Sequence, residues 1–378
     1  MKMLKLAGLY ALAGGLIWSV GVLSAQQGPK PDSSETVARP RKKAEEAPVE
    51  QKKIPSRMKK NNEGVTPAQG PTFRSDVNSV TVDVAVLDNK GRFIPKIPPG
   101  NFRILEDNVP QKIASVNMGE APMTVAMVIE FSNLYQQYWS SGWYETLQAS
   151  YGFLETLKPE DYVEVVAYDL RPEILSDFSQ DKRAAYEAMQ RLRIAAFSES
   201  NMYDALVDTA DRMSEIEGRK AIVLIASGVD TFSKLTFDKT RKALQTAGVP
   251  IYAIGILQAI RELYDARGWM GPIQRLDFLQ ADNQMRTFSR ETGGQAFLPR
   301  FFGEFPGIFR AIGDAMRNQY TVTYNPSNQV RDGKFRKIKV ELVNPATNEP
   351  LRIVDEKGKP MKYQVIAKAG YTAPREVE

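Results

Sequence analysis

Oxygen-bearing side chains stand at or near the ends of apolar runs in three short segments. Glu130 and Ser132 follow one run, Ser227 follows another, and Ser200 opens a stretch with helical periodicity. Mg²⁺ binds oxygen in near-octahedral geometry, usually with one or two carboxylates, waters and a ligand oxygen. Glu130, Ser132 and Ser200 can supply such oxygens, whereas Ser227 is neutral. These residue types could contribute to a divalent-cation site, but with a single acidic side chain among them.

Alternating strand and helix patterns position these residues. Apolar strand candidates cover 124–130, 162–168, 221–226 and 250–257, and helical patterns lie between them. Two later helices are expected near 282–292 and 304–318. Such alternation predicts an α/β fold, with a mostly parallel, Rossmann-like sheet covered by helices on both faces. Ligands bind such a sheet at the carboxyl ends of its strands, where we expect Glu130 and Ser227 to meet.

Both flanks of the α/β region have a β pattern. Each flank is too small to fold alone, so we expect the two to pair into one antiparallel β-sandwich around the inserted domain. The predicted organisation is a signal peptide or anchor at 1–25, a disordered charged linker at 26–70, the first part of the sandwich at 71–120, the α/β domain at 121–318 and the second part of the sandwich at 319–378.

The composition excludes several kinds of chemistry. The 378 residues are 43% hydrophobic and 25% charged, which is ordinary for a globular protein with a real core. The chain has no cysteine and no histidine. Ser-His-Asp catalysis, Cys-His catalysis and the usual zinc sites therefore cannot be assembled. These absences favour a protein that is not an enzyme.

The amino terminus is typical of an export signal. Lys2 and Lys5 precede a charge-free apolar stretch at 6–25 that ends in small residues. We expect the protein to be secreted or periplasmic. The alternative is an uncleaved inner-membrane anchor facing the periplasm, which is the one membrane contact that the sequence indicates.

The net charge of +5 does not indicate a nucleic-acid surface. Lys2 and Lys5 contribute +2, and residues 26–70 contribute a further +4 from ten Lys or Arg and six Asp or Glu. The remainder of the chain is therefore near −1, and no basic groove is expected.

Several motifs between residues 73 and 373, taken together, resemble a bacterial group of secreted von Willebrand factor A-related proteins. They are FRILEDNVPQKI, VIEFSN, SNMYDAL, IASGVDT, ETGGQAFLP, QYTVTYNPSNQVRDGKFRKIKVEL and AGYTAP. The resemblance implies a metal-ion-dependent adhesion site in which an Asp-x-Ser-x-Ser loop, a Thr and a later Asp hold one cation. The loops are degenerate here. Glu130 stands for the first Asp, Leu134 for the second Ser, Ser200 for Thr and Ser227 for the last Asp.

Aromatic residues flank the same predicted edge of the sheet. They are Tyr135, Tyr138, Trp139, Trp143 and Trp269. Aromatics beside a binding rim are frequent contact anchors, although these residues can equally pack into the core or pin a loop. We assign them to a partner-binding rim.

Three functional hypotheses follow. The first is an exported, non-enzymatic interaction or adhesion module that binds a protein partner through the strand-end rim, with no cofactor. The second is an adhesion domain that still loads Mg²⁺ at Glu130, Ser132, Ser200 and Ser227. The third, of a different class, is a hydrolase with Glu130 as general base, and it lacks an evident nucleophile or partner acid.

Overall fold

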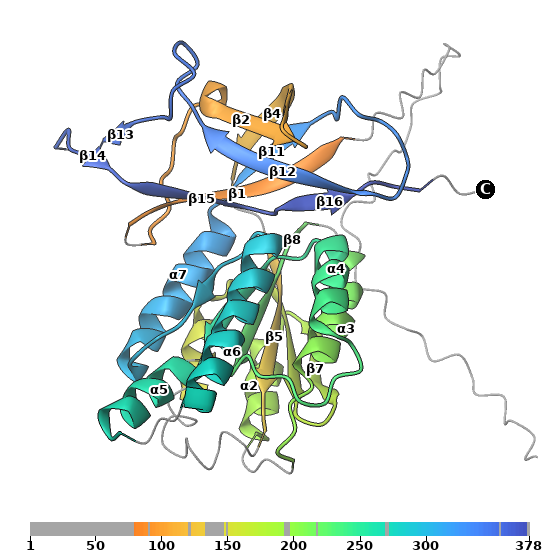
Figure 1. Cartoon of the computed structure of the whole chain (residues 1–378), viewed down its shortest axis with the longest axis vertical. Coiled ribbons are helices and arrows are strands. Elements are labelled where there is room, and N and C mark those ends of the chain that lie inside the picture. The colour runs from red at the N-terminus through yellow and green to blue at the C-terminus, as the bar shows by residue number, and fades with distance from the viewer. Residues whose placement is uncertain are drawn as a thin grey trace, which may run out of the picture. The chain divides into compact units, whose positions relative to one another are not determined.

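Six strands form a mostly parallel sheet in the middle of the chain (Figure 1). The computed structural model describes residues 79–89, 91–119, 122–132, 147–148, 150–192, 197–216, 218–268, 272–354 and 357–375. The strand order is β10-β9-β8-β5-β6-β7. The strands are β5 (Met123–Glu130), β6 (Tyr162–Tyr168), β7 (Pro172–Ser179), β8 (Arg219–Ala226), β9 (Ile251–Gly255) and β10 (Ala296–Phe297). All neighbours pair in parallel except β7, which runs antiparallel to β6.

Strand β5 is buried along its whole length. All eight of its residues, MTVAMVIE, are shielded from solvent. Alternate side chains enter two different cores: Val125 and Met127 join one apolar cluster, and Ala126 and Val128 join the other. A strand that is covered on both faces must be apolar at nearly every position, which explains the continuous hydrophobic run.

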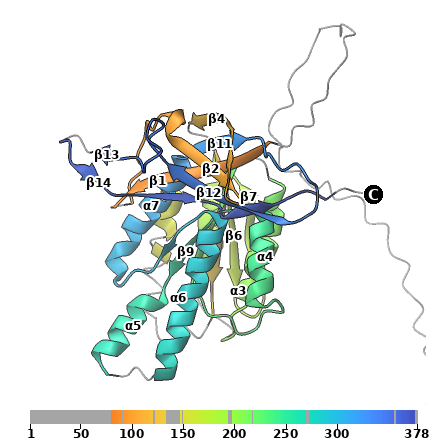
Figure 2. The same ribbon diagram turned by 45° about the horizontal axis from the view of Figure 1, so that its top comes forward.

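Helices cover both faces of this sheet (Figures 1 and 2). The helices are α2 (Lys182–Gln190), α3 (Met202–Ser214), α4 (Phe237–Ala247), α5 (Leu257–Ala266), α6 (Pro272–Thr292), the short η2 (Phe302–Glu304) and α7 (Phe305–Arg317). Side chains of α2 and α7 enter the first core, and those of α3, α4 and α6 enter the second. Among the described residues, no helix is both long enough and apolar enough to cross a membrane.

Strands from both ends of the chain build a β-sandwich (Figure 1). One sheet has the order β15-β1-β11-β4, and the other has the order β16-β12-β2-β3. The amino-terminal elements are β1 (Val80–Asp88), η1 (Pro99–Asn101), β2 (Phe102–Glu106), β3 (Val109–Gln111) and β4 (Ile113–Met118). The carboxy-terminal ones are β11 (Tyr320–Tyr324), β12 (Phe335–Leu342), β15 (Tyr363–Ala367) and β16 (Gly370–Thr372). Strands β13 (Ile353–Val354) and β14 (Pro360–Met361) form a separate two-stranded sheet.

The pairing of these strands interleaves the two ends of the chain. Strand β1 lies between β11 and β15, and β12 lies between β2 and β16. One apolar core joins both sheets, with Val84 and Val322 from one sheet and Ile104 and Ile338 from the other. The predicted fold class, a Rossmann-like α/β domain within an antiparallel sandwich made from both flanks, is confirmed.

Two parts of the α/β domain differ from the sequence-based expectation. Strand β7 was not predicted, because its sequence PEILSDFS does not alternate between apolar and polar residues. Helix α6 was expected near 282–292 but begins ten residues earlier, at Pro272, and α5 was not predicted. Pro272 is the first residue of α6, a position where proline is well accommodated. The predictions for residues 1–25 and 26–70 lie outside the described residues.

The buried carboxylate of Asp161 joins three elements. Asp161 Oδ1 accepts the backbone N–H of Met123 at 2.9 Å, and Oδ2 accepts the N–H of Lys158 at 2.7 Å and Arg317 Nη2 at 2.9 Å. The Asp161 side chain is fully buried. Because Arg317 ends α7, this carboxylate anchors α7 beside the start of β5.

We expect Asp161→Ala to lower the free energy of unfolding by about 3–5 kcal/mol, because it leaves the largely buried guanidinium of Arg317 and the N–H of buried Met123 without their partner. The matched control is Asp177→Ala, which removes an exposed aspartate 2.8 Å from Arg212 Nη2 and should cost less than about 1 kcal/mol. Urea unfolding of both variants measures the difference. Equal losses of unfolding free energy in the two variants would show that Asp161 does not anchor α7.

Candidate functional site

Three loops meet at the carboxyl ends of the parallel strands. We call residues 130–132, 197–201 and 227–235 the strand-end rim. The first loop follows β5 and the third follows β8, and these two strands are paired neighbours in the sheet. The second loop precedes α3 and is hydrogen-bonded to the third, because the N–H groups of Thr231 and Phe232 donate to the Ser200 carbonyl at 2.8 and 3.1 Å. The rim therefore lies where an open α/β sheet offers a ligand site.

The four predicted site residues are all buried in this rim. Ser132 Oγ donates to Glu130 Oε1 at 3.0 Å. Ser227 donates twice to Glu130 Oε2, from its backbone N–H at 2.8 Å and from its Oγ at 2.6 Å. The glutamate thus accepts three hydrogen bonds from two separate loops, so the structure brings Glu130, Ser132 and Ser227 into direct contact.

Ser200 is tied mainly to the backbone of the third loop. Its Oγ donates to the Val229 carbonyl at 2.7 Å, and its N–H donates to Thr231 Oγ1 at 2.9 Å. The hydroxyl also lies close enough to Glu130 to affect the pKa of that carboxyl. Ser200 therefore belongs to the same buried polar cluster, although its own hydrogen bonds go to Val229 and Thr231 of the third loop.

Burial dominates the electrostatics of Glu130. Loss of hydration raises the pKa of this carboxyl from 4.5 to about 7, and hydrogen bonds from Ser227, Ser132 and Ser200 offset only part of that rise. A nearby cation would have the opposite effect, because positive charge favours the ionised form. The protein supplies hydroxyl and amide donors to this carboxyl, and no basic side chain is among the causes of the pKa shift.

The two other aspartates of these loops stabilise backbone groups. Asp230 Oδ1 accepts the N–H of Tyr203 at 3.2 Å and the Ser233 hydroxyl at 2.5 Å, so it caps the start of α3. Asp204, in the first turn of α3, accepts the N–H groups of Lys234 and Leu235 at 3.0 and 3.1 Å. These reciprocal bonds join α3 to the third loop and occupy both carboxylates.

The residues present do not fit a divalent cation. Mg²⁺ needs several oxygens with free lone pairs directed at one point. Here the hydroxyls of Ser132 and Ser227 direct their protons at Glu130, and both oxygens of Glu130 already accept hydrogen bonds. Within the described ranges, no group of three or more acidic, histidine or cysteine side chains could hold a metal.

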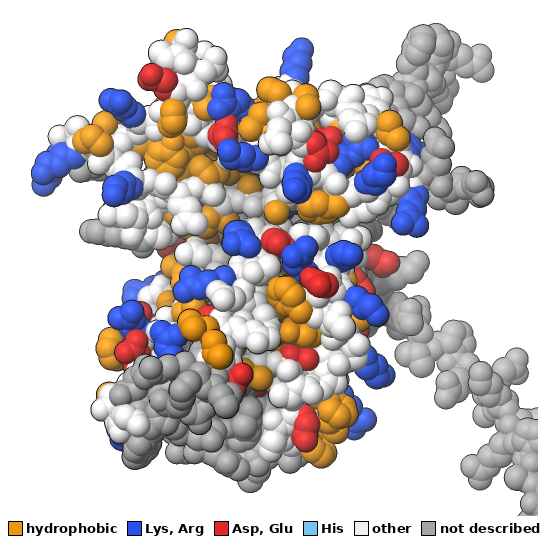
Figure 3. Space-filling view, viewed as in Figure 1, with side chains coloured by type: hydrophobic (Ala, Val, Ile, Leu, Met, Phe, Trp, Pro, Cys, Tyr) orange, Lys and Arg blue, Asp and Glu red, His pale blue; other side chains and the backbone are white. Residues whose placement is uncertain are grey.

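The five aromatic residues assigned to the partner-binding rim, Tyr135, Tyr138, Trp139, Trp143 and Trp269, lie outside the residues whose side chains are described. Other large apolar side chains are exposed near the rim, with exposed fractions between 48% and 68%. We call them the apolar rim residues: Phe197, Phe232, Leu276, Leu279 and Phe301. Apolar side chains reach the surface at this end of the α/β domain (Figure 3).

Local structure places each apolar rim residue. Phe197 and Phe232 belong to the second and third loops, and Phe301 follows the carboxyl end of β10. Leu276 and Leu279 lie in the amino-terminal part of α6, just before the turn that touches the third loop. At that turn, a Cβ added to Gly228 would stand 2.8 Å from the Ala281 carbonyl oxygen. The strand-end rule could have indicated Phe232, whereas the leucines depend on the unpredicted first turns of α6.

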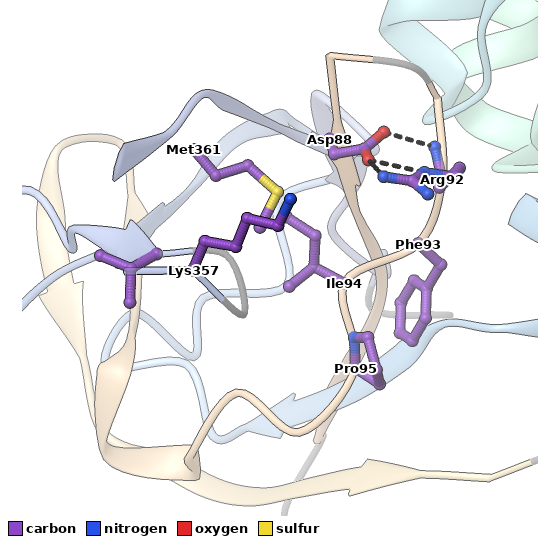
Figure 4. A pocket seen from close by; sticks show the side chains of 8 residues that line it. Asp88, Arg92, Phe93, Ile94, Pro95, Lys357 and Met361 are labelled. Carbon is purple, nitrogen blue, oxygen red and sulfur yellow. Dashed lines mark hydrogen bonds and ion pairs between the residues drawn. The ribbon is translucent and has the colours of Figure 1, made fainter. Parts of the chain in front are cut away.

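A cavity of about 580 Å³ lies in the β-sandwich, apart from the rim (Figure 4). Its walls include Phe93, Ile94 and Met361. Its acidic group, Asp88, accepts Arg92 Nε at 2.8 Å and the Arg92 N–H at 2.9 Å. Because this carboxylate is already paired with the arginine beside it, the cavity does not present a free acid to a substrate.

The pKa of Glu130 predicts a pH dependence of stability. The unfolded chain ionises this carboxyl near pH 4.5 and the folded protein near pH 7. Raising the pH through this window therefore favours the unfolded state, by up to about 3 kcal/mol, and the effect levels off above pH 7. Glu130→Gln cannot ionise, so the stability of the wild type relative to this variant should fall across the window. Urea unfolding at pH 4.5 and 8 measures it, and a constant difference would contradict the prediction.

Comparison with known proteins identifies the middle of the chain. The family model of the von Willebrand factor type A domain matches residues 136–268. This match begins beyond Glu130 and therefore does not bear on the first loop of the rim. No curated protein sequence matches the chain.

Several solved structures are similar at low sequence identity. A von Willebrand factor type A protein from Catenulispora acidiphila is 13% identical, over 79% of this chain and 76% of that one, with a TM-score of 0.40. The vWF domain of the type V pili tip protein Mfa5 from Porphyromonas gingivalis is 13% identical, over 51% of this chain and 94% of that one, with a TM-score of 0.39. Proximal thread matrix protein 1 from the mussel byssus is 12% identical, over 56% of this chain and 51% of that one, with a TM-score of 0.41.

The chain thus spans about half the length of the mussel protein. At TM-scores below 0.5, these likenesses do not identify the fold by themselves. The family match and the helix-covered parallel sheet do so together: this chain contains a von Willebrand factor type A domain.

Proposed function

We propose that this protein is an exported, non-enzymatic interaction module that binds a partner protein through the strand-end rim, without a metal ion. The observation that carries the proposal is the exposure of large apolar side chains near the rim, while its polar centre is buried and internally hydrogen-bonded. Exposed apolar side chains near a site of this kind favour contact with another macromolecule. The rim is therefore suited to protein contact.

The buried state of Glu130 supports binding without a metal. A cation would have to displace three hydrogen bonds to this carboxylate, and no second carboxylate directly contacts Glu130 among the described residues. Asp204 and Asp230 are committed to backbone N–H groups at the start of α3 and in the third loop. The Mg²⁺-loading alternative would require this network to rearrange.

The same burial argues against a hydrolase. A general base must reach the proton that it removes, within hydrogen-bonding distance of a bound substrate. Glu130 is 2% exposed, and both of its oxygens accept internal hydrogen bonds. We therefore assign no catalytic residue. Export is supported by the amino-terminal sequence, with the membrane-anchored form as the alternative.

The rim contact can be tested by replacing two exposed leucines. Leu276→Ser with Leu279→Ser should reduce capture of the partner at least about tenfold, since each buried leucine contributes about 1.5–3 kcal/mol at a contact. The measurement is a pull-down from the native cell envelope, with the captured protein identified by mass spectrometry and its affinity measured with purified partner. The melting temperature should stay nearly unchanged, because both side chains are about half exposed or more.

The matched control for this test is Val330→Ser with Val354→Ser. These valines are 62% and 55% exposed and lie outside the α/β domain, Val330 between β11 and β12 and Val354 in β13. The control variant should capture the same partner with unchanged affinity. Equal losses in both double variants would show that the rim is not the contact surface.

Metal independence has its own test. We expect titration calorimetry with Mg²⁺ or Mn²⁺ to give no saturable heat, and a chelator to leave partner capture unchanged. Saturable binding that disappears in Glu130→Ala would overturn the metal-free proposal and support the Mg²⁺-dependent alternative.

A further inference from the structure

Hydrogen bonds connect the buried carboxylate of Glu130 to the exposed surface of the rim. Ser227 Oγ donates to Glu130 and also accepts the N–H of Val229 at 2.9 Å. The Val229 carbonyl accepts Ser200 Oγ at 2.7 Å, and the Ser200 carbonyl accepts the N–H of Phe232 at 3.1 Å. A path of hydrogen bonds and short backbone links therefore runs from the buried end of β5 to the backbone of Phe232, a residue that is 53% exposed.

The length of the Glu130 side chain allows this arrangement. Its carboxylate reaches the donors of Ser227, across the boundary between β5 and β8, and still accepts the hydroxyl of Ser132 in its own loop. An aspartate at the same position would be one methylene shorter and could not hold both sets of donors from the same backbone position. Glu130 thus connects the first and third loops through a hydrogen-bond acceptor that is part of the protein chain.

Helix α6 confines the third loop from the other side. Gly228 has a φ of 82°, and a Cβ there would lie 2.8 Å from both the Ala281 carbonyl oxygen and the Met285 methyl carbon. The backbone at Gly228 is therefore packed directly against α6, while the preceding residue, Ser227, is bonded to Glu130. This packing places the third loop between the glutamate and the helix that carries Leu276 and Leu279.

We infer that Glu130 is a positioning residue that holds the three rim loops together through protein atoms alone, so that the rim is fully assembled before any ligand or cation arrives. The part of this inference that concerns partner binding rests on the proposed function. Its consequence is that the surrounding divalent-cation concentration does not control the availability of Phe232 and the other apolar rim residues.

Removing the Glu130 carboxylate is costly because it leaves buried hydrogen-bond donors without an acceptor. Without the carboxylate, the N–H and hydroxyl of Ser227 and the hydroxyl of Ser132 would lose their acceptor in a site that water does not reach. Unsatisfied buried groups are disfavoured, so the loops would move to find other partners. Glutamine keeps one oxygen for Ser227, and the Ser132 hydroxyl can turn to accept from the new amide.

The test is hydrogen–deuterium exchange of the purified full chain, which needs no partner. Glu130→Ala and Ser227→Ala should each speed amide exchange in residues 227–233 at least about tenfold, the effect expected from losing about 1.4 kcal/mol of local stability. Glu130→Gln should remain near the wild-type rate. Adding Mg²⁺ or a chelator should not change exchange in the wild type.

The matched control is Ser289→Ala. Ser289 is a buried serine on α6 whose hydroxyl has no hydrogen-bond partner among the described residues, so this change removes the same atom without breaking a bond seen there. Exchange in residues 227–233 should be unaffected. If Glu130→Ala does not fold, Ser132→Ala and Ser227→Ala still test the tie, because each leaves the carboxylate in place.

Two results would overturn the inference. One is unchanged exchange in residues 227–233 when Glu130 or Ser227 is replaced by alanine. The other is saturable protection of these amides from exchange by Mg²⁺ in the wild type, which would show that a cation holds the loops together. Because exchange is measured without a partner, failure here leaves the rim contact untouched. Conversely, if the leucine test shows that the rim is not the contact surface, the role of Glu130 in holding the loops together is unaffected.

Discussion

Burial of β5 on both faces is the constraint on which the rest of the α/β domain depends. Helices from both sides contribute to the two cores that this strand separates. The strand therefore carries its last residue, Glu130, into a region from which water is largely excluded. A carboxyl placed there must be neutral or receive strong donors. The serines of two loops meet that demand, so the packing of the core determines the chemistry of the rim.

Periodicity predicted most of this fold because most of its elements have one dominant environment. The continuous apolar runs of β5 and β8 are typical of strands that are buried on both faces. In β12, the alternating pattern indicated which side chains face the core of the sandwich. Apolar periodicity did not predict the elements that lie at an edge of the sheet or project into solvent. Strand β7 pairs on one side only, and the first turns of α6 expose Leu276 and Leu279, so neither leaves a regular apolar stripe.

The candidate site was predictable in position but not in its hydrogen bonding. The strand-end rule placed Glu130 and Ser227 at one edge of the sheet because parallel strands share a direction. In the structure, Ser227 Oγ lies 2.6 Å from Glu130 Oε2. The direction of each donor depends on backbone angles that sequence does not reveal. The sequence therefore showed Ser227 only as a neutral candidate ligand, whereas its hydroxyl and N–H donate to the Glu130 carboxylate. The role of Asp230 as a cap for α3 is a tertiary contact that the sequence could not disclose.

The interleaved sandwich also constrains the order in which the chain can fold. Val80 of β1 pairs with Tyr324 of β11, so more than two hundred residues separate the two partners. Closing so large a loop is entropically costly unless the intervening segment has already condensed. We therefore expect the α/β domain, whose neighbouring strands are much closer in sequence, to form first and bring the flanks together. Until then β1 to β4 have unpaired edges, which makes the emerging amino-terminal half dependent on rapid completion of the chain or on protection by other proteins.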